Sequence, residues 1–211
     1  MSNSSRAASP APPPDTDARA RILAAARAEF AAHGREAASV HEIAARAGVT
    51  AAMINYHFGG KAALYAAALD EAQRALLTRL GAALPGGPRD GAAALARRLA
   101  GAYFDCLAED GELQRLLARE MLDPRPDAPE LARFVAPLRA ILTEHFGDGG
   151  EAAQRAISLF GAISGYFLYA PLLPPVIGAA PHSADALRRR RRHVLALATS
   201  LARGLDRRRQ R

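Results

Sequence analysis

The chain has 211 residues, half of them apolar, with a formal net charge of +7 and a single cysteine, Cys106. One cysteine excludes an internal disulfide and a cysteine-rich metal site, whereas the apolar content is sufficient for a packed core. The positive charge does not by itself indicate a nucleic-acid-binding protein, because residues 188–211 hold ten arginines and one aspartate and the rest of the chain is slightly acidic.

The first residues predict an arm followed by a helix. Residues 1–15 are rich in serine and proline and lack the apolar core of a secretory signal, so we expect a disordered arm on a cytoplasmic protein. Apolar residues then recur at helical spacing from Asp17 to His33, and Gly34 follows as a stop signal. Alanine and leucine are abundant and β-branched residues are sparse throughout, which predicts an all-α fold.

Two short helices are predicted next. Ser39 lies three residues before Glu42, a Ser-x-x-Glu pattern that satisfies the free amide groups at a helix start. Gly48 interrupts this helix, and Thr50 is placed to cap a third helix that ends near His57. Three helices with a glycine-containing turn between the second and the third describe a helix-turn-helix, and its third helix has a suitable size for the major groove of DNA.

The remaining chain is predicted to be helical over the ranges 62–83, 90–109, 111–122, 127–146, 150–170 and 184–206. Residues 156–181 carry no charge, but Pro171, Pro174 and Pro175 break the helix before it is long enough to cross a bilayer, so we expect neither a membrane span nor a membrane partner. The expected parts are an arm (1–15), a helix-turn-helix domain (16–62), a helical ligand-binding and dimerisation domain (63–206) and a basic tail (207–211).

The segments RILAAARAEFAAHG and SVHEIAARAGVTAAMINYHFGGKAALY resemble the N-terminal DNA-binding domain of the TetR family of transcriptional regulators. The resemblance implies a homodimer that binds a pseudo-palindromic operator in double-stranded DNA, with an all-helical C-terminal domain that binds a small-molecule effector. Repression that the effector relieves is the usual behaviour of this family. The segment REMLDPRPDAPELARFVAPLRAILTEHF is similar to the C-terminal region of the CecR-like subgroup. Arg35 and Asn55 depart from the family pattern, so no operator sequence is implied.

The resemblance carries DNA contacts over to the third helix and the lysine after it, namely Thr50, Ala51, Ala52, Asn55, Tyr56, His57 and Lys61. Asn55 can pair with N7 and N6 of adenine, or it can contact only phosphate or water. Ala51 and Ala52 allow a close approach to thymine methyl groups or are simple helix formers. Tyr56, His57 and Lys61 are placed for phosphates, with a hydrogen-bonded core histidine as the alternative for His57.

The C-terminal half carries signals for a dimer and an effector. Small residues at Gly161, Ala162, Ser164 and Gly165, with an apolar seam at Leu187, Val194, Ala198, Leu201 and Leu205, predict a four-helix interface between two copies. The arginines at 188–192 are expected to be solvated and salt-bridged, or to contact nucleic acid or an acidic partner. A largely apolar effector is assigned to side chains that a core would also explain: Tyr103, Phe104, Leu117, Met121, Phe134, Leu138, Phe160 and Tyr166.

No nucleophile elbow, phosphate loop or metal-ligand spacing occurs in the sequence, so we expect no enzyme activity, no metal and no cofactor. A helical ligand-binding or membrane-surface protein with a helix-turn-helix that has lost its function is the remaining alternative to a regulator. Sequence-selective, salt-dependent DNA binding distinguishes the two.

Overall fold

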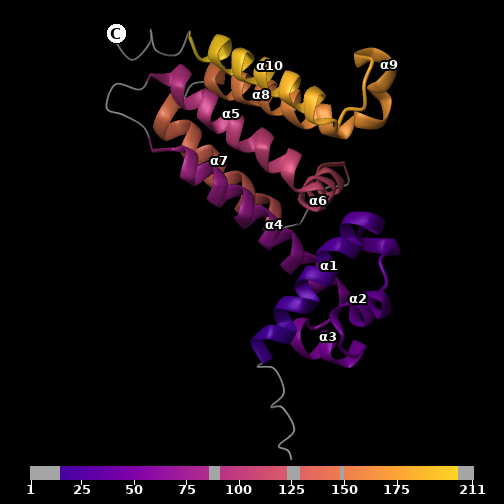
Figure 1. Ribbon diagram of the computed structural model, residues 1–211. Helices are drawn as coiled ribbons and strands as arrows, with labels where there is room; N and C mark the ends of the chain where they lie inside the picture. Colours follow the sequence, from indigo (N-terminus) through magenta and orange to yellow (C-terminus); the bar gives the residue numbers. More distant parts are fainter. Residues whose placement is uncertain (1–14, 86–90, 123–128, 148–149, 204–211) are drawn as a thin grey trace, which may run out of the picture. The chain divides into compact units, whose positions relative to one another are not determined.

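The computed structural model describes residues 15–85, 91–122, 129–147 and 150–203, with the backbone alone for 15–16 and 129–135. Within these ranges every regular element is a helix, which confirms the predicted all-α fold (Figure 1). The chain forms two compact units that divide between Ala68 and Leu69, inside helix α4 (Lys61–Ala83).

The N-terminal unit consists of α1 (Asp15–Ala37), α2 (Val40–Ala47), α3 (Ala51–Phe58) and the first residues of α4, coloured indigo to purple in Figure 1. Its core is made of completely buried apolar side chains, namely Ile22, Ala26, Phe30, Ile43, Ile54 and Leu64. The rings of Phe30 and Tyr65 meet edge to face with 5.0 Å between their centroids, and this contact joins α1 to α4.

The first helix is interrupted at Gly34, where the sequence predicts its end. Gly34 has φ 76° and ψ 175°, and a short helical stretch continues from there to Ala37. A residue with a Cβ atom rarely adopts this conformation, so glycine is what lets the chain change direction here. The predicted stop at Gly34 is confirmed, and a further short helical stretch then ends at Ala37.

The start of α2 shows only half of the predicted capping pattern. The side chain of Ser39 accepts a hydrogen bond from the backbone N–H of Glu42 at 3.3 Å, as predicted. The reciprocal bond differs, because the backbone N–H of Ser39 donates to the carboxylate of Glu29 on α1 at 3.3 Å, whereas Glu42 is exposed. A carboxylate from another helix thus takes the place that the sequence pattern assigns to Glu42.

The turn between α2 and α3 depends on Gly48. This residue is left-handed, with φ 66° and ψ 39°, and its N–H donates to the carbonyl of Ala45 at 3.2 Å. Thr50 then caps α3, because its side chain accepts a hydrogen bond from the N–H of Met53 at 3.4 Å. The predicted starts of both helices and the turn between them are confirmed.

Replacing Gly48 by alanine is expected to lower the free energy of unfolding of the N-terminal unit by about 1–2 kcal/mol, because left-handed backbone is strained for a residue with a Cβ. A Cβ at Gly48 would meet nothing within 4 Å, so the loss would report strain and not a clash. Gly81→Ala is the control: this site inside α4 is equally open, and alanine there favours the helix by about 1 kcal/mol. Urea unfolding measures both variants, and unchanged stability of Gly48→Ala would contradict the strain.

The C-terminal unit holds the rest of α4 with α5 (Ala92–Glu109), α6 (Gly111–Leu122), α7 (Pro129–Phe146), α8 (Gly150–Leu168) and α10 (Ala184–Ala202). The yellow α10 lies along α5 and α8 in Figure 1. A Cβ on Gly101 of α5 would lie only 3.4 Å from Cδ2 of Leu195, so α5 and α10 approach each other closely. Phe104, Ile163 and Val194 are almost completely buried and form part of the core of this unit.

The apolar seam of the last helix is covered largely by its own chain. Val194 and Ala198 are 0% exposed in a single copy, because α10 packs against α5 and α8. Leu187 and Leu201 are half-buried, and Leu205 lies outside the described residues. The predicted use of this seam for a symmetry mate is therefore wrong for Val194 and Ala198, since a partner cannot reach side chains that the chain itself covers.

The proline-rich segment after α8, where the sequence predicts a break in the helix, contains two short helices. They are a 3₁₀ helix, η1 (Ala170–Leu172), and α9 (Pro174–Ile177), and both have proline in their first turn. Proline suits the start of a helix because its φ is already helical and its missing N–H has no partner there. A membrane-spanning length of apolar helix is not found among the residues that the structure describes.

Candidate nucleic-acid interface

The outer side of α3 carries residues predicted to read DNA. Ile54 is 0% exposed and holds the inner side of the helix against the core. Ala51 is half-buried, and the remaining predicted contacts at this face are exposed, namely Thr50, Ala52, Asn55 and Tyr56. The Tyr56 side chain is 80% exposed. A helix of eight residues with such an outer side fits a major groove, which is about 12 Å wide.

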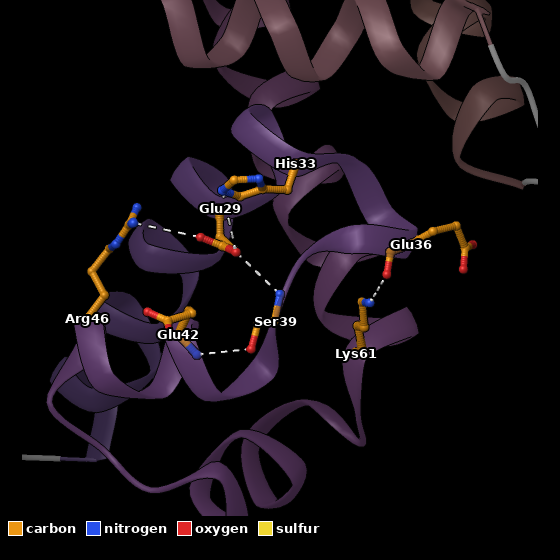
Figure 2. A network of polar contacts seen from close by, with 7 residues as sticks. All are labelled: Glu29, His33, Glu36, Ser39, Glu42, Arg46 and Lys61. Atoms are coloured by element: carbon orange, nitrogen blue, oxygen red, sulfur yellow. Dashed lines mark hydrogen bonds and ion pairs between the residues drawn. The ribbon is translucent and has the colours of Figure 1, made fainter.

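His57 and Lys61 have contacts within the N-terminal unit. The half-buried ring of His57 meets the rings of Tyr56 and Phe58, with centroid distances of 5.2 and 6.4 Å. Nζ of Lys61 donates to the backbone carbonyl of Glu36 at 2.6 Å, which joins the start of α4 to the end of α1 (Figure 2). An ammonium group has three N–H donors, so this bond still leaves donors for a phosphate.

Sequence reasoning missed the carboxylate of Glu29, which lies behind this interface. Glu29 is 4% exposed, and its Oε1 accepts the hydrogen bond from Ser39. Its Oε2 lies 3.7 Å from a guanidinium nitrogen of Arg46, and Nε2 of His33 lies 3.9 Å from Oε1 (Figure 2). The available sequence signal is its position, four residues after the buried Ala25 and therefore on the inward side of α1.

Two arginines of α1 also reach the helix-turn-helix, and the sequence did not single them out. Nε of Arg21 donates to the carbonyl of Ala47 at 3.1 Å, where a cation is favourable at the C-terminal end of α2. The guanidinium of Arg19 lies 4.9 Å from the ring centroid of Phe58, at the end of α3. Arg19 is exposed and adds a positive charge beside the predicted contact residues.

Residues 22–68 match the sequence model of a family described as bacterial regulatory proteins, tetR family. The N-terminal unit is a TetR-family domain. The matched residues include α2, α3, the turn between them and each predicted DNA contact from Thr50 to Lys61. They make up less than half of the chain, and the match does not extend into the C-terminal unit.

Solved structures show that the likeness in fold continues beyond the TetR-family domain. A transcriptional regulator from Rhodococcus sp. RHA1 has a TM-score of 0.66 and 26% sequence identity, covering 89% of this chain and 97% of its own. A TetR-like transcriptional regulator from Rhodococcus sp. RHA1 has a TM-score of 0.61 and 20% identity over 86% and 93%. FadR from Bacillus subtilis, in complex with stearoyl-CoA, has a TM-score of 0.64 and 19% identity over 86% and 97%. No curated protein sequence matches the chain.

In the unit that follows the TetR-family domain, three of the predicted effector residues come together. Tyr103, Leu117 and Met121 line a cavity of about 10 Å³ with Ser164 and Phe167. The hydroxyl oxygens of Tyr103 and Ser164 are 2.7 Å apart, and both residues are buried. A space of this size holds at most about one water molecule, so the cavity is closed to an effector in this conformation.

The other predicted effector residues are dispersed. Phe104 packs against Phe167 with 5.3 Å between ring centroids, whereas Phe160 is 36% exposed and stacks on Tyr103 at 5.3 Å. Leu138 is half-buried, and the side chain of Phe134 lies outside the described residues. The described members therefore do not line one common pocket.

Tyr166 belongs to a different site, a surface groove of about 580 Å³ between α8, α9 and α10. Its hydroxyl donates to the carbonyl of Pro181 at 2.7 Å, and the guanidinium of Arg190 lies 5.3 Å from its ring centroid. The groove also contains apolar side chains of α9 and the arginine Arg189. As for metals, the described residues include no group of three or more His, Cys, Asp or Glu side chains that could hold an ion.

Alkaline pH is expected to weaken the C-terminal unit through Tyr103. Burial raises the pKa of its hydroxyl above the ordinary value of 10.0, although the hydrogen bond with Ser164 acts in the opposite direction. The unfolded chain loses this proton near the ordinary pKa, so the contribution of Tyr103 to stability is full below about pH 10 and declines as the pH rises toward the folded pKa.

Urea unfolding at about pH 8 and about pH 11 measures this dependence, because the wild type should lose more free energy of unfolding than Tyr103→Phe. The phenylalanine variant also leaves the Ser164 hydroxyl without this bond, which costs about 1 kcal/mol at either pH. Equal losses in the two proteins would show that Tyr103 does not titrate on unfolding.

Proposed function

We propose that the protein is a transcriptional regulator that binds a pseudo-palindromic operator in double-stranded DNA as a homodimer. The observation that carries this proposal is the exposed outer side of α3, with Asn55 and Tyr56, on a TetR-family domain. A side-chain amide suits adenine in the major groove, and two such helices in a dimer fit successive grooves about one helical turn apart. Such a regulator acts where the DNA is, in the bacterial cytoplasm.

The proposed DNA contacts are Thr50, Ala51, Ala52, Asn55, Tyr56, His57 and Lys61. Asn55 is proposed to read a base edge, whereas Thr50, Tyr56 and Lys61 are proposed to contact phosphates. His57 is half-buried, so we propose that it supports the packing of α3 in addition to contacting the DNA backbone. The exposed Arg19 adds a further phosphate contact to this set.

The exposed side of α8 is proposed as the contact between the two copies. Ile157 is 62% exposed and Phe160 36% exposed, and a Cβ on Gly161 would meet nothing within 4 Å. Apolar side chains beside an open glycine allow a second helix to approach closely, and a two-fold axis would place the same surface of the second copy against it.

The regulator is proposed to be a repressor, released from its operator by a largely apolar effector. The FadR structure holds stearoyl-CoA, whose acyl chain is apolar. The C-terminal unit of this chain has an apolar cavity, closed in this conformation, with one buried hydroxyl pair at Tyr103 and Ser164, and an effector would have to open it. The effector must bind more tightly to the conformation that does not bind DNA, or it could not release the operator. Because α4 contributes residues to both units, we assign the transmission of this change to α4.

The test is a selection of binding sequences from a random double-stranded DNA library with the purified full-length chain. The expected product is a palindromic motif with half-sites about ten base pairs apart, bound roughly a thousandfold or more tightly than a shuffled sequence. The affinity for both DNAs should fall steeply with salt. If binding depends on salt but shows no sequence preference, DNA binding would be assigned to the arginines of 188–211. If the protein does not bind DNA, a helical ligand-binding protein would be favoured. Either result would overturn the proposed function.

A further inference from the structure

We propose that Glu29 is a positioning residue for sequence-selective DNA binding: its carboxylate fixes α2, and through α2 the helix α3, on the scaffold helix α1. The inference rests on the proposed function. Glu29 does not belong to the exposed DNA-contacting residues, because only 6% of its side chain is exposed.

The carboxylate of Glu29 contacts two residues that belong to opposite ends of α2, Ser39 and Arg46 (Figure 2). At the first end, Oε1 accepts the N–H of Ser39, the N-cap residue, at 3.3 Å. At the other end, Oε2 lies 3.7 Å from the guanidinium of Arg46, which lies in the last turn of the helix. Both contacts converge on one carboxylate, which holds the N-cap backbone directly and the last turn through the side chain of Arg46, so two residues of α2 are attached to the same point of α1.

The charge of Glu29 strengthens both contacts. An ionised carboxylate accepts a stronger hydrogen bond from an amide than a neutral oxygen does, and a negative charge is favourable at the N-terminus of a helix. A carboxylate that is largely withdrawn from water also needs partners of opposite charge. Arg46 is one such partner, and the ring of His33 lies 3.9 Å from Oε1.

The orientation of α2 is passed to α3 through a short turn. Gly48, Val49 and Thr50 alone separate the two helices, and the N–H of Val49 donates to the carbonyl of Ala44 at 3.0 Å. A rotation of α2 therefore moves the outer side of α3. Hydrogen bonds to base edges require well-defined positions, whereas attraction to phosphates tolerates displacement, so a loosened α2 should reduce selectivity more than general DNA binding.

The test compares Glu29→Gln and Glu29→Ala with Glu42→Gln in the full-length chain. Glu42 is the matched control because it is exposed, lies on α2 and carries the same charge, while only its backbone N–H bonds to Ser39. The measured quantity is the ratio of affinities for the selected operator and for a shuffled sequence, at a temperature where circular dichroism shows each variant folded. We expect this ratio to fall about tenfold in both Glu29 variants, with shuffled-sequence affinity unchanged or raised, because one negative charge is lost near DNA.

An unchanged ratio in both Glu29 variants, or an equal fall in Glu42→Gln, would overturn the positioning role. Hydrogen exchange of the Ser39 amide tests the contact itself without DNA: it should be faster in Glu29→Ala and unchanged in Glu42→Gln. If the wild type shows no operator preference, the proposed function fails, and the Ser39 exchange rate still decides whether Glu29 holds α2. Glu29→Gln keeps an acceptor for Ser39 and serves as the decisive variant where Glu29→Ala does not fold.

Discussion

A chain in which Asn55 and Tyr56 are both alanine is expected to lose sequence-selective DNA binding while remaining folded. Both side chains are exposed, and Tyr56 is 80% exposed, so truncation removes little from the core. A base-reading pair contributes about 1–3 kcal/mol of discrimination, and a homodimer presents each residue twice, so operator affinity should fall by at least about a hundredfold. Fluorescence anisotropy with the selected operator and a shuffled sequence measures the change.

Lys61→Ala provides the contrast for this experiment. A phosphate contact carries no sequence information, so its loss should weaken binding to both DNAs alike and make the salt dependence shallower. The double variant should instead bring the operator down to the affinity of the shuffled sequence. If the double variant retained the preference of the wild type, the reading of DNA would have to be assigned to residues outside α3.

Replacing Phe30 by alanine is expected to destabilise the N-terminal unit by about 3–5 kcal/mol, the range typical of large aromatic side chains removed from a core. Phe30 is 0% exposed, and its ring meets that of Tyr65 at a centroid distance of 5.0 Å. Without the ring, a cavity would replace the contact between α1 and the start of α4. Because single domains have only about 5–15 kcal/mol of stability, this loss should lower the unfolding temperature of the N-terminal unit strongly.

Tyr56→Ala is the matched control for Phe30→Ala, since it also removes an aromatic ring from the N-terminal unit but from an exposed position. Thermal unfolding monitored by circular dichroism should show a separate early transition in Phe30→Ala and none in Tyr56→Ala. The same unfolding curve for both variants would mean that the ring of Phe30 does not hold the core of this unit together.

Much of the helix-turn-helix was predictable because its signals are local. The capping side chains of Ser39 and Thr50 act on amides three residues away, so the pattern and the hydrogen bond occupy the same short segment. The inward direction of Ile54 and the outward direction of Asn55 follow in the same way from helical spacing. The predicted DNA-contacting side chains are therefore exposed, apart from Ala51, His57 and Lys61, which are half-buried.

The C-terminal unit was harder to predict because aromatic residues mark a core and a ligand site equally well. The sequence places Tyr103 and Tyr166 among residues that either line an effector site or belong to the core. In the folded chain Tyr103 faces a closed cavity beside Ser164, whereas Tyr166 lies in a groove with Arg190. Which of two neighbouring helices covers a given ring depends on how those helices pack, and no short-range pattern carries that information.

The all-α fold, the break at Gly34, the turn at Gly48 and the outward side of α3 follow from local sequence, because backbone hydrogen bonding and helical spacing depend on residues close together in the chain. Contacts between distant segments are seen only in the folded chain: Glu29 and not Glu42 accepts the N–H of Ser39, and α5 and α8 rather than a second copy cover Val194. A buried N–H group needs a hydrogen-bond acceptor, and an apolar side chain needs a surface that covers it from water. The packing of distant segments determines which residues provide them.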